Sequence, residues 1–547
     1  MAVDDVQVGD RPPLSLISSS APSPFLFRHD DARRHRATDA IDASSHPIRP
    51  TGRPHRHCRS PNPTDMAADN RSARVALAAF AATAFLYLRR RRRSDHRGGK
   101  SSIPEQLTGR VGSRGVAALG PAIPYLDAFL KCLFDACDPV SNPRGHIALC
   151  MAENKLVTEV LAQRLMSPGT AASAFADSVV YSYNGFLGLP QAREAVAYFL
   201  ARKFLGSTEK GLIDPQHVAF GSGAASLLNY LCFALAEEGD AVLIPAPYYA
   251  AFESDMATIA KCVPFPIVQS DPTAGPTLSE LNAAMSKAKA KGLRPRIVLL
   301  TNPNNPIGTV YEPEVIKRTI EWARKHKVHT IVDEIYALSV RNRDFESVLQ
   351  TMDNKLENDV HFLWALSKDF VSSGFRIGIL YTQNEALLRT LQNLNIFSGV
   401  SHPMQLIAAE ILTDDGFVDS FLKTSREQLS LACNICSEKL NEMVVPHVIP
   451  EAGMFVYANF SSLLPSQTPE GEERFATLVQ DAARVVMTPG QSMRDPRIGW
   501  FRICVAYYPD LDVLKIALER LSRLILKIKG MGWENISADS VRAQIFS

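Results

Sequence analysis

The stretch ALSKDFVSSGFRIG, residues 365–378, places Lys368 and Arg376 on one short segment of chain. Two cations held this close repel each other unless an anion lies between them. A lysine near other cations in a dry pocket loses its proton easily, and its neutral amine can then form an imine with an aldehyde. The planar guanidinium of Arg376 binds the oxygens of a phosphate in pairs. The stretch therefore predicts a pocket for a molecule that carries both an aldehyde and a phosphate.

Around this stretch, five apolar runs each end at an unusual polar cluster. They are HVAF before GSGAAS, AVLIP before APYY, RIVLLT before NPNNPIG, HTIVDE before IY, and VHFLWALS before Lys368. Short apolar runs that alternate with helical patterns are typical of an α/β fold with a mostly parallel sheet. In such a sheet the carboxyl ends of the strands meet at one crevice, where ligands bind. We therefore expect the polar clusters to form a single site.

The phosphate end of this site is predicted at the turn GSGAAS, residues 221–226, which precedes a helical pattern. The first N–H groups of a helix have no intrahelical acceptor, and the positive end of the helix dipole attracts anions. Backbone N–H groups at Gly223 and Ala224 are therefore candidate phosphate ligands, together with Ser367 and Arg376. A turn of this kind is by itself weak evidence, because most such turns have a structural role.

The other end of the site would hold an aromatic ring. Asp333 ends a buried apolar strand, where a carboxylate is costly unless it is paired, and a protonated ring nitrogen would pair it. Tyr336 and Asn305 offer a phenol and an amide to a ring hydroxyl, and Tyr249 offers a face for stacking. Each residue alone has an ordinary explanation as a cap, a turn or a core side chain. Together they predict pyridoxal 5'-phosphate (PLP) as the cofactor.

The motifs NPNNPIG, DEIY, SKD, GFRIG and GWFRIC, in this order and spacing, give the chain a family resemblance. It resembles fold-type I PLP enzymes, specifically the class I/II aminotransferases and their plant relatives, the 1-aminocyclopropane-1-carboxylate (ACC) synthases, from about residue 115 to about residue 530. The resemblance implies a large domain with a mostly parallel sheet between helices and a smaller α+β domain. It also implies that Lys368 bonds to the cofactor and moves the proton, that Asp333 pairs with the ring nitrogen, and that Arg502 binds the substrate α-carboxylate.

Two positions depart from the family pattern. Ala224 stands where the phosphate-binding turn usually has Thr or Ser, and Ala365 stands where a Ser is usual. Loss of one neutral hydrogen bond costs about 1 kcal/mol, so we expect weaker cofactor binding rather than none. These losses also motivate a third class of function, a catalytically silent interaction protein tethered to a membrane, which the intact Lys368, Asp333, Arg376 and Arg502 disfavour.

The choice between aminotransferase and ACC synthase depends on two other segments. CMAENKL, residues 150–156, resembles the segment with which ACC synthases recognise S-adenosylmethionine, so Glu153 and Asn154 favour the lyase. Tyr183 precedes Gly188 by five residues, which resembles aspartate aminotransferases, where this tyrosine reaches the cofactor phosphate of the other subunit. We therefore predict a homodimeric aminotransferase whose small-molecule substrates are an amino acid, such as aspartate or an aromatic amino acid, and a 2-oxo acid. An ACC synthase of ethylene biosynthesis is the alternative.

The composition is that of a globular protein, with a net charge of +2 over 547 residues, and gives no reason to expect a nucleic-acid partner. The nine cysteines lack the close, even spacing of a disulfide scaffold, which favours a reducing compartment. The CxxC at Cys433 and Cys436 lies in a helical pattern without a second pair, so we interpret it as packing and predict no metal site.

The N-terminal part of the chain has a different character. Residues 1–65 are rich in Pro, Ser, Arg and His and are predicted to be a disordered basic extension. Residues 66–100 contain an apolar run, 75–88, followed by five arginines, 89–93. This run is short for the ~20 residues of a membrane span, but it could anchor the protein and leave the catalytic part in the cytosol. A solvated helix and a transit peptide, hence a plastid, remain alternatives, and translation could start at Met66.

The globular texture begins near residue 101. We predict an N-terminal arm and the first part of the small domain at 101–219, a large PLP-binding domain at 220–415, and the rest of the small domain at 416–547. In this division Arg502 belongs to the small domain, so substrate binding would draw the two domains together and expel water.

Overall fold

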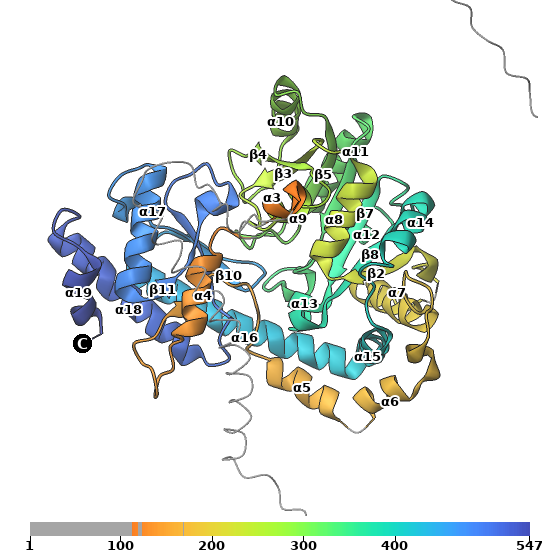
Figure 1. The fold of residues 1–547 in the computed structure, drawn as a ribbon, viewed down its shortest axis with the longest axis horizontal. Helices are drawn as coiled ribbons and strands as arrows, with labels where there is room; N and C mark the ends of the chain where they lie inside the picture. The colour runs from red at the N-terminus through yellow and green to blue at the C-terminus, as the bar shows by residue number, and fades with distance from the viewer. Residues whose placement is uncertain (1–111, 119–122, 168, 210, 547) are drawn as a thin grey trace, which may run out of the picture. The chain divides into compact units, whose positions relative to one another are not determined.

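The largest sheet among the described residues has seven strands, in the order β2-β8-β7-β6-β5-β3-β4 (Figure 1). The computed structural model describes residues 112–118, 123–167, 169–209 and 211–546. β8 runs antiparallel to its neighbours β2 and β7, and the remaining pairs are parallel. The strands are β2 (Val218–Ser222), β3 (Ala241–Ala246), β4 (Val263–Val268), β5 (Pro295–Thr301), β6 (His329–Asp333), β7 (Val360–Ala365) and β8 (Ile377–Tyr381).

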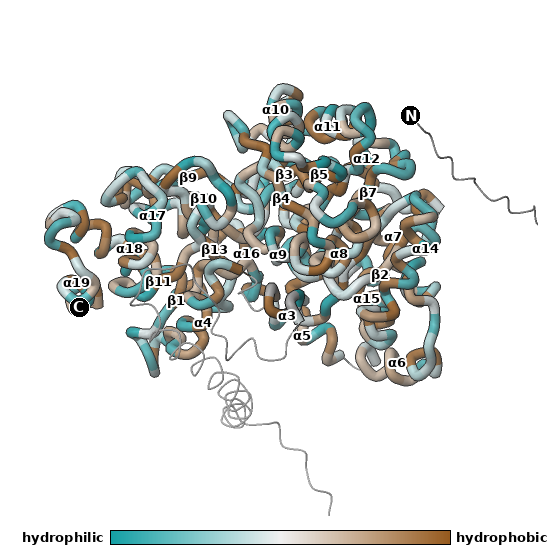
Figure 2. The backbone as a smooth tube through the Cα atoms, turned by 45° about the horizontal axis from the view of Figure 1, so that its top comes forward, coloured by the Kyte–Doolittle hydropathy of each residue, from teal (hydrophilic) through white to brown (hydrophobic). Residues whose placement is uncertain are grey.

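Helices cover both faces of this sheet because successive strand residues point to opposite sides. In β5, Ile297 and Leu299 pack with α8, α9 and α14, whereas Val298 and Leu300 pack with α7, α10, α11 and α15. Teal (hydrophilic) and brown (hydrophobic) segments alternate along α11 in Figure 2, as expected for an amphipathic helix with one side on the core. The helices are α7 (Pro190–Phe204), α8 (Ala224–Leu235), α9 (Phe252–Ala257), α10 (Leu278–Ala290), α11 (Pro313–Lys325), α12 (Val348–Thr351), α13 (Leu366–Asp369), α14 (Glu385–Leu394) and α15 (His402–Thr413).

A second core forms around two smaller sheets. The four-stranded antiparallel sheet has the order β12-β13-β10-β9, and β1 pairs with β11 in parallel. Their strands are β1 (Ile147–Ala148), β9 (His447–Val448), β10 (Phe455–Asn459), β11 (Val485–Val486), β12 (Thr488–Pro489) and β13 (Trp500–Cys504). The remaining helices are α3 (Ser113–Ala117), α4 (Leu126–Phe134), α5 (Thr158–Met166), α6 (Thr170–Ala176), α16 (Asp415–Glu442), α17 (Pro469–Leu478), α18 (Leu511–Met531) and α19 (Ala538–Ile545).

The extension 1–65, the candidate anchor with its arginines (75–93) and Met66 lie outside the described residues, so those interpretations stay predictions. No helix among the residues that the structure describes is long and apolar enough to cross a membrane. The domain boundaries at 219 and 415 also stay predictions.

A histidine pair, His361 buried and His329 partly buried, lies near the amino ends of β7 and β6, at the opposite end of the sheet from the polar clusters. His361 on β7 is fully buried; its Nδ1 lies 2.8 Å from Thr382 Oγ1 and its Nε2 lies 3.2 Å from His329 Nδ1. Burial, together with a smaller effect of the neighbouring His329, lowers the pKa of His361 to about 3. The folded protein therefore resists protonation of His361 at pH values where an unfolded histidine is charged.

This pair predicts a loss of stability in acid. The unfolded histidine titrates near pH 6.5, so His361 stabilises the fold fully above that pH and progressively less as the pH falls toward its folded pKa. The free energy of unfolding should fall by about 1.4 kcal/mol per pH unit for this group, or about 2 kcal/mol between pH 6.5 and 5. Denaturant unfolding of wild type and His361→Gln at both pH values measures the difference. In His361→Gln the free energy of unfolding should change less between the two pH values than in wild type. His447→Gln, on the partly exposed β9, should show the same change as wild type. A His361→Gln protein with the wild-type change would contradict the account.

Candidate active site

A cavity of about 180 Å³ lies at the carboxyl end of the parallel strands. Thr301 ends β5, Asp333 ends β6, and Ser367 follows β7, so the topology alone brings these side chains to one edge of the sheet. The cavity is lined by eight of the residues predicted from the sequence: Ala224, Tyr249, Asn305, Asp333, Tyr336, Ser367, Lys368 and Arg376.

Lys368 reaches into the cavity from α13. Its Nζ donates a hydrogen bond to the backbone carbonyl of Ala152 at 2.6 Å. Burial lowers the pKa of Lys368 below its ordinary value; Glu153 opposes this effect, and Arg502 and Arg376 lower the pKa further. The neutral, nucleophilic form of the amine is thus more accessible than in a solvent-exposed lysine.

Asp333 is buried at the end of β6. Burial raises its pKa to about 7, although the N–H of Ile335, 3.2 Å from its Oδ1, and the charge of Lys368 oppose the shift. A carboxylate this poorly compensated gains stability from a cation placed against it. A protonated ring nitrogen is such a cation.

Arg376 and the start of α8 form the opposite end of the cavity. Arg376 Nη2 donates to the carbonyl of Ser222 at 3.2 Å, and Nη1 donates to that of Ser373 at 3.1 Å. Ala224 and Ala225, the first residues of α8, line the cavity, and their N–H groups have no intrahelical acceptor. This end therefore presents a guanidinium and helix N–H groups, which suits an anion.

Gly223 has a different role from the one expected. Its N–H donates to the carbonyl of Gly221 at 2.7 Å, so it is not free for a phosphate. A Cβ at this position would lie 2.6 Å from Arg376 Nη2, and the backbone has a φ of +84°. Glycine is required here because it makes room for Arg376 and permits the turn.

Arg502, on β13, lies beside the cavity and is linked to it by Asn305. Its Nη1 donates to Asn305 Oδ1 at 2.9 Å, and Asn305 Nδ2 lies 3.4 Å from Tyr336 Oη. Nη2 donates to the carbonyl of Cys150 at 2.7 Å, while Nε is buried without a partner among the described residues. An arginine that is 1% exposed and has an unused donor is suited to a carboxylate ligand.

The remaining predicted residues lie outside the cavity lining. Glu153 is near it: its Oε1 accepts from Ser373 Oγ at 2.8 Å, and its charge acts on Lys368. The side chain of Asn154 is directed elsewhere, donating to Ser425 Oγ at 3.1 Å and accepting from the N–H of Leu156 at 3.1 Å. Tyr183 is 94% exposed, so the chain's own cavity does not use it. The roles of these residues stay predictions.

Three groups at the site were missed from the sequence. They are the carbonyl of Ala152, the carboxylate of Asp255 in the cavity wall, and Thr488 Oγ1, which lies 3.3 Å from Arg502 Nη2. A backbone carbonyl leaves no signal in a sequence. Asp255 stands in the first turn of α9, where an acidic residue is ordinary.

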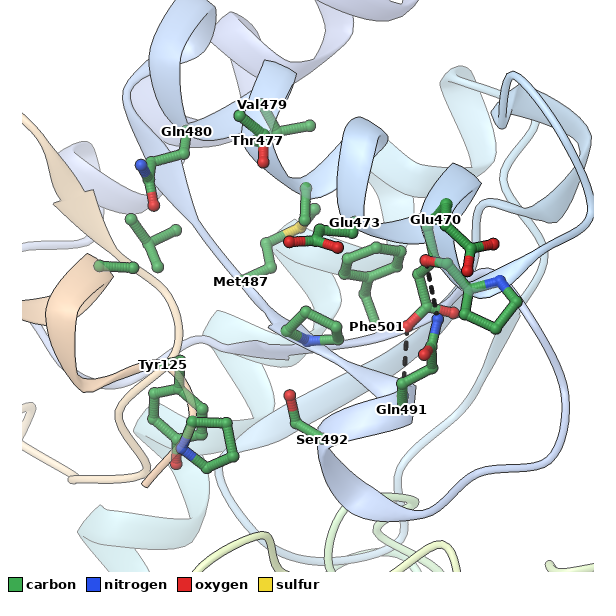
Figure 3. A pocket seen from close by; sticks show the side chains of 17 residues that line it. Tyr125, Glu470, Glu473, Thr477, Val479, Gln480, Met487, Gln491, Ser492 and Phe501 are labelled. Carbon is green, nitrogen blue, oxygen red and sulfur yellow. Dashed lines mark hydrogen bonds between the residues drawn. The ribbon is translucent and has the colours of Figure 1, made fainter. Parts of the chain in front are cut away.

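A second cavity, of about 400 Å³, lies between the start of α4 and α17 (Figure 3). Tyr125, Glu473 and Gln491 line it, and Gln491 is held by hydrogen bonds to its neighbours. None of the residues predicted to bind the cofactor lines this cavity, so the chemistry is assigned to the smaller one. Among the described residues, no cluster of three or more His, Cys, Asp or Glu side chains could hold a metal ion.

Comparison with known proteins agrees with this geometry. The model of the family "Aminotransferase class I and II" matches residues 148–521. The chain belongs to this family. An ACC synthase of Glycine max is 31% identical over 425 residues, which cover 75% of this chain and 86% of that protein. ACC synthase 5 of Oryza sativa is 32% identical over 428 residues, which cover 75% and 79% of the two chains.

Several solved structures that resemble the chain are named as aminotransferases. The aspartate aminotransferase of Rhizobium meliloti superposes with a TM-score of 0.63 at 23% identity, covering 76% of this chain and 98% of that one. The Thermus thermophilus aspartate aminotransferase with maleate gives 0.61 at 22% identity, covering 76% and 100%. These likenesses, with the mostly parallel sheet between helices, confirm the predicted fold-type I α/β fold.

The family depends on PLP, which confirms the cofactor predicted from the sequence. The residues present fit it. Lys368 offers an amine of lowered pKa for the aldehyde, Asp333 offers an uncompensated carboxylate for the ring nitrogen, and Arg376 with the start of α8 suits the phosphate. Gly223 keeps this end open.

Proposed function

We propose that this protein is a PLP-dependent aminotransferase, which exchanges an amino group between an amino acid and a 2-oxo acid. The observation that carries the proposal is the cavity in which Lys368, Asp333 and Arg376 converge beside the buried Arg502. Aspartate or an aromatic amino acid is the proposed donor. When bound, PLP withdraws electrons from the substrate Cα and so makes its proton acidic.

The residues of the chain have separate tasks in this reaction. Arg502 holds the substrate carboxylate through its guanidinium fork, with Asn305 fixing its orientation. Burial lowers the pKa of Lys368, and in its neutral form the amine accepts the proton from the substrate Cα as general base and later donates it as general acid. The Ala152 carbonyl, 2.6 Å from Nζ, positions the amine for this transfer.

The spacing of Tyr183 before Gly188 supports aminotransferase over ACC synthase, as do the named activities of the structural neighbours. ACC synthase remains the second candidate because one observation favours it. Glu153 lies at the edge of the site, hydrogen-bonded to Ser373, and its charge acts on Lys368. Curated relatives at 31–32% identity are named ACC synthases. An acid in this position could recognise a cationic substrate such as S-adenosylmethionine.

Product analysis distinguishes the two reactions. The purified protein is incubated with S-adenosylmethionine and, separately, with pairs of amino acid and 2-oxo acid, and the products are separated by chromatography. The proposal predicts amino-group exchange in the second incubation and no ACC in the first. ACC release without amino-group exchange would reverse the assignment. Glu153→Gln should spare amino-group exchange, whereas it should impair ACC formation if the lyase reaction is the real one.

The same proposal includes a homodimer in which Tyr183 serves the partner's site. Tyr183→Phe removes one hydrogen bond to a charged phosphate, which is worth about 1.5–3 kcal/mol, so the PLP dissociation constant should rise about tenfold or more. Fluorescence titration with PLP measures this constant. Tyr181→Phe is the control, because Tyr181 is also exposed but donates to its own Phe175 carbonyl at 2.8 Å. Equal affinities for both variants would count against the dimeric site.

A further inference from the structure

Asp255 lines the cavity but has no role in the account given so far. It lies in α9 and shares the cavity wall with Ala224 and Arg376. Its backbone carbonyl accepts from Asn229 Nδ2 at 2.7 Å, but within the described residues no hydrogen bond reaches its carboxylate. An unpaired carboxylate in the wall of a cavity is costly, and the molecule that fills the cavity is the natural partner for it.

The surroundings of Asp255 place it at the phosphate end. Arg376 is the cation that acts on Asp255, and the first residues of α8 line the wall beside it. Helix α9 packs directly on α8, which carries the anion-binding N–H groups. Arg502, the proposed ligand of the substrate carboxylate, lies outside the cavity lining and is not among the charges that act on Asp255, so we assign Asp255 to the cofactor and not to the substrate.

The charges at this end do not balance if Asp255 is ionised. A phosphate monoester carries about −1.5 to −2 charge near neutral pH. Arg376 contributes one positive charge, and a helix N-terminus about half a charge. An ionised Asp255 would add to the excess of negative charge, whereas a protonated carboxyl adds none and offers an O–H donor. The site also lacks two hydroxyl donors that the family usually has, one in the turn, where Ala224 stands, and one at the end of β7, where Ala365 stands.

We propose that Asp255 is a further cofactor-binding residue, which takes up a proton when PLP binds and then donates a hydrogen bond toward its phosphate. The proton comes from the solvent and is released when the cofactor leaves. The inference rests on cofactor binding in this cavity, which the proposed function shares, and holds for either reaction.

The titratable groups around Asp255 are consistent with this role. Tyr249 and Cys232 lie within its electrostatic reach, as do Arg376 and Asp333, while Lys368 lines the same cavity. Neither α8 nor β4, which pack on α9, contains a charged side chain. On α9 itself, Glu253 is occupied by Arg494, at 2.7 and 2.9 Å.

Burial raises the pKa of Asp255 to about 7, against the opposing charge of Arg376. Below this pH the carboxyl is already protonated, and PLP binding needs no further proton. Above it, each pH unit should weaken PLP binding about tenfold, because a proton must be bound along with the phosphate. Pyridoxal, which lacks the phosphate, should not show this additional dependence.

The test compares the dissociation constants of PLP and pyridoxal between about pH 6.5 and 9, measured by protein fluorescence. Titration of Lys368 affects the binding of both ligands, so the ratio of the two dissociation constants does not depend on it. In the wild type the dissociation constant of PLP divided by that of pyridoxal should rise about tenfold per pH unit above pH 7. In Asp255→Asn this ratio should not change with pH. The exposed Asp344→Asn is the matched control and should behave as wild type.

A second measurement needs no variant and so does not depend on how Asp255→Asn folds. Calorimetry of wild type at about pH 8, in two buffers of different ionisation enthalpy, gives the number of protons bound with each ligand. About one more proton should accompany PLP than pyridoxal. Equal proton counts, or the same pH slope in Asp255→Asn as in wild type, would overturn the proposal while leaving the cofactor assignment intact. Failure of wild type to bind PLP at all would overturn both.

Discussion

Replacing Lys368 by alanine will lower the rate of amino-group exchange by about 10⁴-fold, the upper range for removal of a positioned general base. The variant will also lose the visible absorbance band that PLP gives when it is bound covalently. Both losses follow from one atom, because Nζ is the amine whose pKa burial lowers and the group to which the proposed function assigns both cofactor attachment and proton transfer. Steady-state kinetics and absorbance spectra of the purified protein measure them.

Lys287→Ala is the matched control for this prediction. Lys287 is exposed on α10, so its removal tests for effects of charge alone and should leave both the rate and the spectrum unchanged. A Lys368→Ala protein that retains the band would show that another amine holds the cofactor. A protein without the band before mutation would instead support the catalytically silent class of function.

Arg502→Lys will lower kcat/KM for amino-acid substrates by about 10²- to 10³-fold. Lysine keeps the charge but not the planar fork, and each hydrogen bond of the fork to a charged carboxylate is worth about 1.5–3 kcal/mol. Arg502 is held in place by Asn305 and the Cys150 carbonyl, and its Nε has no partner within the described residues, so the fork is prepared for a carboxylate. The PLP absorbance band should remain, since Arg502 lies outside the cofactor cavity lining.

The decisive comparison for Arg502 is a substrate without a carboxylate. Reaction of the bound cofactor with a simple alkylamine should be equally fast in Arg502→Lys and wild type, whereas reaction with the corresponding amino acid should be slow in the variant. Arg497→Lys, which changes a nearby arginine paired with Asp495 at 2.8 Å, should have little effect on either. An equal loss for both substrates would mean that Arg502 has a purely structural role.

The sequence predicted the main part of the site because strand ends are predictable. Asp333 ends one recognisable buried strand and Ser367 follows another, and parallel strands bring their carboxyl ends together. The site could be anticipated wherever position follows from topology. Arg502 is different: it stands within β13, far along the chain, and without the family resemblance its position would have given no reason to place it near Asn305.

What the sequence could not predict depends on backbone details. Arg376 has a φ of 56°, in the left-handed region, which directs its guanidinium back to the Ser222 carbonyl. The N–H of Gly223 is used by Gly221, although a free donor was expected there. Lys368 is held by the backbone of Ala152, and no side-chain pattern reports such a contact. These features arise from tertiary packing that local sequence does not encode.

The central claim is that PLP occupies the smaller cavity and is attached at Lys368. Borohydride reduction of the PLP-loaded protein fixes that attachment, and mass spectrometry of the digested chain then locates the modified residue. The account predicts the added phosphopyridoxyl mass on Lys368, on about one site per chain. Modification at any other lysine, or at none, would contradict it.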